Sequence, residues 1–126
     1  MEKEETEKVS KILQKRINMT MLYDLYSPLL TGKQREIFEL HEILDFSLSE
    51  ISEKLGTSRQ GIHDILNRTF EKLERTEKEL GFSSKLDKQK DHLINIERII
   101  EKNRQRIPEE LYKGLNTILD SAKGDL

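Results

Sequence analysis

The 126-residue sequence lacks cysteine and tryptophan and has only two prolines. These shortages exclude several kinds of chemical site and of fold. Without cysteine there is no disulfide, no thiolate metal site and no cysteine nucleophile, a composition that fits a reducing compartment. Two prolines and six glycines leave room for long uninterrupted helices. Val9 is the only valine, which argues against a strand-rich fold. These shortages predict an all-α protein.

Long hydrophobic runs and an excess of one charge are also missing. Residues 1–5 are mostly charged and no apolar core follows them, so they do not form a signal peptide. No segment approaches the ~18 apolar residues of a membrane span, and we expect a soluble, cytoplasmic protein with no membrane partner. Lys and Arg total 22 and Asp and Glu 24, a net charge of −2. Strong binding to nucleic acid would therefore require well-placed cations.

Signatures of catalysis are absent. His41, His63 and His92 are the only histidines, and no two of them lie at metal-ligand spacing on one helix. The sequence has no Gly-rich phosphate loop and no G-x-S-x-G turn. We therefore predict that the protein is not an enzyme and uses no metal or other cofactor, and that His41, on an apolar helix face, is a core histidine.

What is present is a succession of helical patterns. Apolar residues recur at spacings of three and four, which predicts five or six helices in one domain over residues 1–126. We expect a central helix-turn-helix module at residues 17–80, long C-terminal helical arms at residues 83–122, and no assigned role for residues 1–16. Helix boundaries are marked by Pro28, the capping pairs Thr31 with Gln34 and Ser47 with Glu50, and Gly56, Ser58, Gly81 and Pro108.

The segment from Leu48 to Ile65 predicts the helix-turn-helix itself. This motif needs a short helix, a turn of three or four residues that often contains glycine, and a second helix packed across the first. Ser52 is the small residue at the crossing, residues 56–58 form the turn, and the remaining pattern supplies apolar contacts from both helices. An ordinary helical hairpin is the alternative interpretation of the same pattern.

If the module binds nucleic acid, the second helix presents its N-terminal residues to base edges. Arg59 is suited to guanine and Gln60 to adenine, while Lys54 and Arg68 are suited to phosphates. Residues 58–74 carry three cations and three anions, including Asp64 on the groove face, so strong DNA binding by a monomer is not expected. The candidate nucleic-acid-binding residues are Lys54, Ser58, Arg59, Gln60, His63, Asn67 and Arg68.

Two runs resemble known helix-turn-helix proteins. Residues 30–35 and 46–52 look like the module that closes sigma factors. Residues 58–64 (SRQGIHD), with Arg68-Thr69 after them and residues 21–26 (MLYDLY) before, resemble the YlxM family. This resemblance implies an all-helical fold related to sigma-factor region four and a regulatory or accessory role in the signal-recognition-particle pathway. The partners it implies are particle RNA or particle proteins.

Two other functions remain open from the residues alone: a DNA-binding transcriptional regulator, and a helical protein–protein adapter. The sequence pattern of the C-terminal arms is relevant to the adapter function. Leu86, Leu93, Ile100 and Ile107 recur every seven residues, with Asn103 interrupting the series. Residues 111–119 add another apolar stripe. If these side chains stayed exposed to solvent, the protein would lose several kcal/mol of stabilisation, at ~25 cal/mol per Å2 of buried apolar surface. We therefore expect a homodimer held mainly by the arms.

Overall fold

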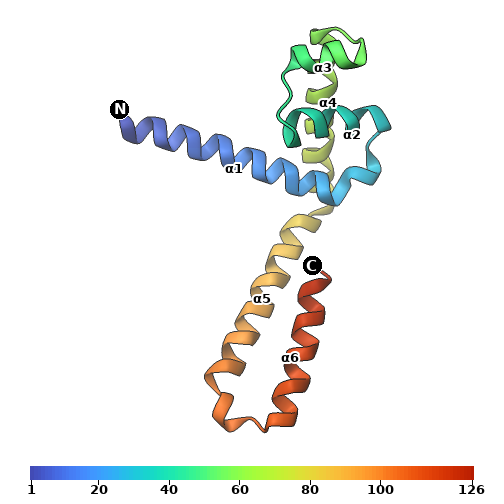
Figure 1. Cartoon of the computed structure of the whole chain (residues 1–126). Coiled ribbons are helices and arrows are strands. Elements are labelled where there is room, and N and C mark those ends of the chain that lie inside the picture. The colour runs from blue at the N-terminus through green and yellow to red at the C-terminus, as the bar shows by residue number, and fades with distance from the viewer. The chain divides into compact units, whose positions relative to one another are not determined.

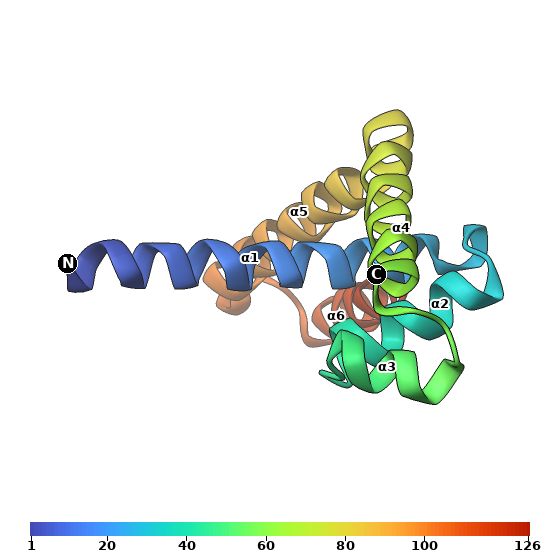
Figure 2. The same cartoon turned by 90° about the horizontal axis from the view of Figure 1, so that it is seen from above.

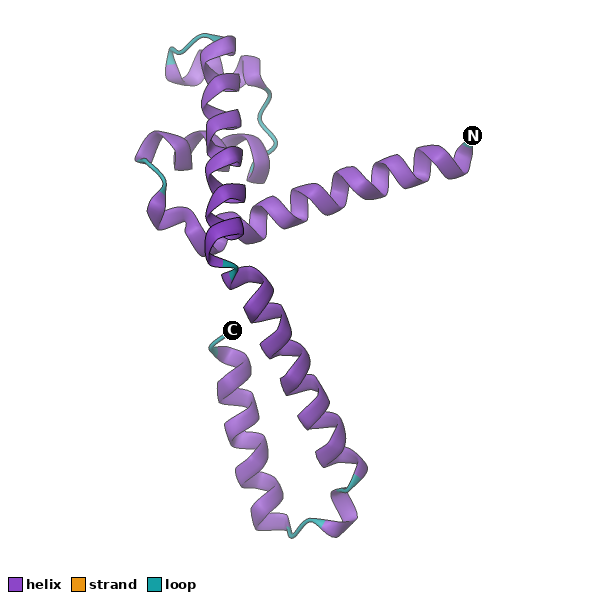
Figure 3. Cartoon of the chain, turned by 180° about the vertical axis from the view of Figure 1, so that it is seen from behind, coloured by secondary structure: helices purple, strands orange, loops and turns teal.

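The computed structural model describes all residues 1–126 and contains helices only, with no strand (Figure 3). The elements are α1 (Glu2–Tyr26), the 3-10 turn Ser27–Leu29, α2 (Gly32–Phe38), the π-helical turn Glu39–Ile43, α3 (Leu48–Leu55), α4 (Arg59–Leu80), α5 (Phe82–Lys102), the 3-10 turn Arg104–Arg106 and α6 (Glu109–Gly124). The prediction of an all-α fold with five or six helices is confirmed. No helix combines the length and apolar character that crossing a membrane requires.

The chain divides into two compact units, Met1–Gly81 and Phe82–Leu126. The boundary lies between the predicted module and the predicted arms. Gly81 forms it with a φ of 65°, a left-handed conformation that glycine adopts without strain and that ends α4. That the two units unfold together as a single domain stays a prediction.

The first unit is built around α4, against which α1, α2 and α3 pack (Figure 1). One core cluster joins α1 to α2 and α4, and a second joins α2, α3 and α4. Phe70 of α4 contacts both clusters, and Phe38 beside it is completely buried. Because the second cluster lies under the helix-turn-helix, it fixes α3 across the N-terminal half of α4 (Figure 2).

Most predicted helix boundaries are confirmed by their capping geometry. Thr31 and Ser47 each accept a hydrogen bond from the amide three residues on, and Gln34 and Glu50 complete the two capping boxes. Pro28 lies in the 3-10 turn that ends α1. The end of the heptad series is wrong: α5 ends at Lys102, so Ile107 is not on it. Pro108 is the residue before α6 rather than its first residue.

One further expectation is wrong. His41 is not a core histidine: its side chain is 35% exposed, and Nδ1 lies 2.9 Å from Oε1 of Glu42. It lies in a π-helical turn, whose extra residue rotates side chains away from the face that regular periodicity assigns. The first turns of α1 are helical and bury little of their apolar surface. Their apolar residues are half or more exposed, namely Val9, Ile12, Leu13 and Ile17.

Tyr23 and Arg16 attach α1 to the π-helical turn. The Tyr23 hydroxyl donates to Oε1 of Glu39 at 2.5 Å; burial, followed by this bond, raises the pKa of Tyr23 to about 12. The Arg16 guanidinium lies 2.5 Å from Oδ1 of Asp45, and it also donates to the carbonyl of Glu42 at 3.1 Å. Asp45 has a φ of 59°, which lets the chain reverse after the π-helical turn.

We expect Gly56→Val to destabilise the first unit by about 1–2 kcal/mol, because Gly56 has a φ of 68°, where a β-branched side chain is strained. The position of Gly61 inside a helix predicts that Gly61→Ala is neutral or stabilising, but a Cβ at Gly61 would lie 3.0 Å from Cγ2 of Thr57. Gly32→Ala is the better control, because nothing lies within 4 Å of its Cβ position. Urea unfolding of the three proteins measures the difference. Equal losses for Gly56→Val and Gly32→Ala would contradict the assigned turn.

Candidate nucleic-acid interface

The turn between α3 and α4 is held by hydrogen bonds that its own residues supply. The Ser52 hydroxyl donates to the carbonyl of Thr57 at 2.5 Å, and Ser58 Oγ accepts from the amide of Gly61 at 3.1 Å. Ile51 and Ile62 are completely buried on either side of the turn. The crossing of the two helices is therefore fixed by packing and by local capping, and it holds the start of α4 at the surface.

All seven predicted binding residues are exposed. Ser58 Oγ caps α4 by accepting a hydrogen bond from Gly61, and the hydroxyl can still donate its own proton. Gln60 Nε2 donates to Oδ1 of Asp64 at 2.9 Å, and the side chains of Asn67 and His63 lie 3.4 Å apart. Lys54 lies over the Phe46 ring, 5.7 Å from its centroid.

The polar side chains of α4 form a stripe with a cation on each side. Gln60, Asp64 and Asn67 are spaced by three or four residues and share one face of the helix. Arg59 and Arg68 are about two and a half turns apart and point to opposite sides of that stripe. Neither arginine forms an ion pair within the chain. A helix lying in a groove presents this arrangement, with its middle toward the bases and its edges toward two phosphate backbones.

The fold brings one further cation to this surface, which sequence reasoning missed. Lys33, in the first turn of α2, has its Nζ 3.4 Å from the Thr57 hydroxyl oxygen, beside the start of α4. Lys72 is engaged elsewhere, since its Nζ donates to the carbonyl of Leu29 at 2.6 Å. We call Lys33, Lys54, Arg59 and Arg68 the cation set. No group of three or more His, Asp and Glu side chains is arranged to hold a metal ion.

These features define a helix-turn-helix protein. The family described as "Putative helix-turn-helix protein, YlxM / p13 like" matches residues 13–114, and the chain belongs to that family. It is 47% identical over 95 residues to a UPF0122 protein of Thermoanaerobacter sp. (strain X514), covering 74% of this chain and 81% of the relative. It is 36% identical over 107 residues to the UPF0122 protein of Halalkalibacterium halodurans, covering 85% of this chain and 96% of the relative. The predicted family is therefore confirmed.

Proposed function

We propose that the protein is an accessory factor of the signal-recognition-particle pathway that binds the particle's RNA through α3 and α4. The observation that carries this proposal is the exposed polar stripe of α4, flanked by the unpaired cations Arg59 and Arg68. The pathway is what the family resemblance implies. The proposed role is one of binding through the helix-turn-helix.

The acidic members of the stripe favour RNA over duplex DNA. Asp64 and Glu71 are exposed on the same face as Gln60. In a duplex groove these carboxylates would lie between two rows of negatively charged phosphates, whose potential disfavours them. Sequence-specific RNA recognition targets loops and bulges, whose unstacked bases offer donors that a carboxylate accepts. A DNA-binding regulator remains the second candidate, because Arg59 and Gln60 lie at the helix start, where helix-turn-helix proteins contact base edges.

The test compares how tightly the protein binds a fluorescent fragment of the particle RNA and a duplex DNA of the same length. Both are measured at the same salt concentration. We expect the RNA to bind more tightly, and Arg59→Ala and Gln60→Ala each to weaken it by about 1–3 kcal/mol. Arg75→Ala is the matched control, because Arg75 is an exposed cation of the same helix that lies about 24 Å from Arg59 along the helix axis. Tighter binding to DNA would favour the regulator, and no binding to either at low salt would contradict both.

A further inference from the structure

The second unit is an antiparallel hairpin of α5 and α6 that has almost no core of its own. Ile100 and Leu119 are its only buried side chains. Tyr112 of α6 donates to Glu101 of α5, and Lys123 pairs with Glu97, so polar contacts also hold the two helices together. A helical unit of this size with two buried side chains gains little stability from its own interior.

Exposed apolar side chains gather on one outer face of the hairpin. Ile96 and Ile99 of α5 are 46% and 62% exposed, and Leu111 and Ile118 of α6 are 55% and 68% exposed. On each helix, these exposed residues are rotated about the helix axis away from the residues that contact the other helix. The rotation is about a quarter to a third of a turn, and it has the same sense on both helices. Since the helices are antiparallel, both displacements lead to one face. We call Ile96, Ile99, Leu111, Gly114 and Ile118 the hairpin face.

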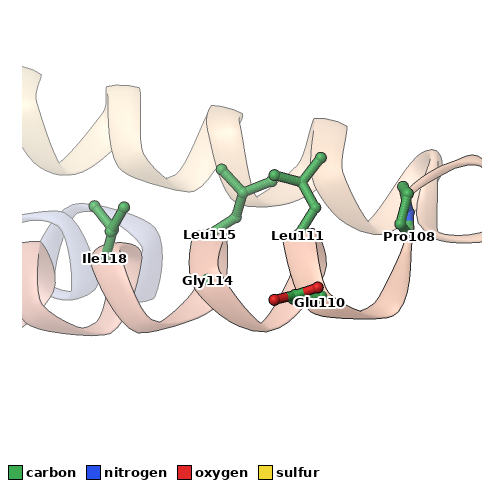
Figure 4. Close-up of a pocket in the computed structure, with 6 residues that line it drawn as sticks. All are labelled: Pro108, Glu110, Leu111, Gly114, Leu115 and Ile118. Carbon is green, nitrogen blue, oxygen red and sulfur yellow. The ribbon is translucent and has the colours of Figure 1, made fainter.

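Gly114 lies in the middle of the α6 part of this face. An open groove of about 460 Å3 follows that part of α6, with Leu111, Gly114 and Ile118 along it and Glu110 as its one charged residue (Figure 4). A Cβ at Gly114 would meet nothing within 4 Å, so packing within the chain does not require glycine there. Glycine inside a helix is unfavourable compared with alanine, but it permits close approach of another backbone.

We propose that the hairpin face binds the hairpin face of a second copy of this chain, with α6 approaching its counterpart at Gly114. The five residues of the hairpin face are uncharged, and Glu110 is the one charged residue of the groove beside them. Such a face meets its own copy with little repulsion and offers little to a charged partner. At 1.5 Å per residue α6 is about 24 Å long, and two helices of about 10 Å diameter give a face of roughly 480 Å2. Two such faces bury about 960 Å2, the size of a weak, reversible interface, and together the two hairpins form a four-helix bundle.

The experiment is sedimentation equilibrium of the full chain between about 1 and 100 µM. We expect a monomer–dimer equilibrium in which Ile118→Asp weakens association by about 100-fold or more, because a charge would be buried without a partner. The substituted residue is 68% exposed in the single chain, so folding is retained, and circular dichroism verifies it. Gly114→Leu should also weaken association while helicity stays equal or rises.

Ile94→Asp is the matched control, since Ile94 is 49% exposed on the opposite side of the same hairpin and should leave association unchanged. A wild-type chain that is monomeric at 100 µM overturns the proposal, as does equal weakening by Ile94→Asp and Ile118→Asp. If Ile17→Asp on α1 dissociates the dimer and Ile118→Asp does not, the surface is misassigned. Nucleic-acid binding is not needed for this association, so either proposal can fail without the other.

Discussion

Phe38→Ala is expected to lower the free energy of unfolding of the first unit by about 3–5 kcal/mol. Phe38 is 0% exposed, stacks on Tyr23 with ring centroids 4.3 Å apart, and meets the edge of Phe70 at 6.0 Å. Truncation removes both aromatic contacts and leaves a cavity between the two core clusters. Since a whole domain is stable by about 5–15 kcal/mol, this single change removes a large part of that stability.

Thermal unfolding followed by circular dichroism measures this effect, and the first unit should melt at least about 12 °C lower. Phe82→Ala is the control of the same residue type, because Phe82 is 46% exposed and lies outside the first unit. Its replacement should change the midpoint by a few degrees at most. If Phe38→Ala and Phe82→Ala shift the midpoint equally, Phe38 does not occupy the core position described here.

The local features of the fold were predictable because they depend on residues a few positions apart. A hydroxyl at Ser47 with a carboxylate at Glu50 specifies a helix start, and the structure contains that capping box. Gly56 specifies a left-handed helix end in the same way, with a φ of 68°. The helix-turn-helix could be placed from the sequence because its turn is short and its crossing depends on the small residue Ser52.

Features that depend on contacts between distant residues were not predictable. The π-helical turn at Glu39–Ile43 changes the register of the second helical segment, and it is held by Tyr23 and Arg16 from α1. No local pattern announces that extra residue, so periodicity placed His41 in the core. The apolar stripe at the start of α1 was equally clear in the sequence, but periodicity does not tell whether the opposing surface belongs to the same chain.

The candidate site shows the same division. The exposure of Arg59, Gln60 and Arg68 follows from the helical periodicity of α4, whose opposite face carries the buried Ile62 and Leu66. That Lys33 joins them, and that Lys72 is bonded to the carbonyl of Leu29, depends on how α2 and the end of α1 pack on α4. Counting charges along one helix therefore included Lys72, which is bonded elsewhere, and left out Lys33, which belongs to another helix.

The second large effect that we expect is the dependence of the proposed RNA binding on salt, through the cation set. If all four cations of the set neutralise phosphates, the logarithm of the binding constant should fall with the logarithm of salt concentration with a slope of about −2.8 to −3.6. Raising the salt from about 50 to 200 mM should then weaken binding by about 50- to 150-fold. Fluorescence anisotropy titrations of the full chain with the particle RNA, at four or five salt concentrations, give the slope.

Two lysine variants make this measurement specific to the site. Lys33→Ala should reduce the magnitude of the slope by nearly one, because its ammonium group lies beside the start of α4 and is held only by a 3.4 Å contact with Thr57. Lys72→Ala removes the same charge from α4 itself, but the Lys72 ammonium donates to Leu29 at 2.6 Å, so the slope should not change. A slope near zero, or equal changes for the two variants, would place the phosphate contacts somewhere other than this cation set.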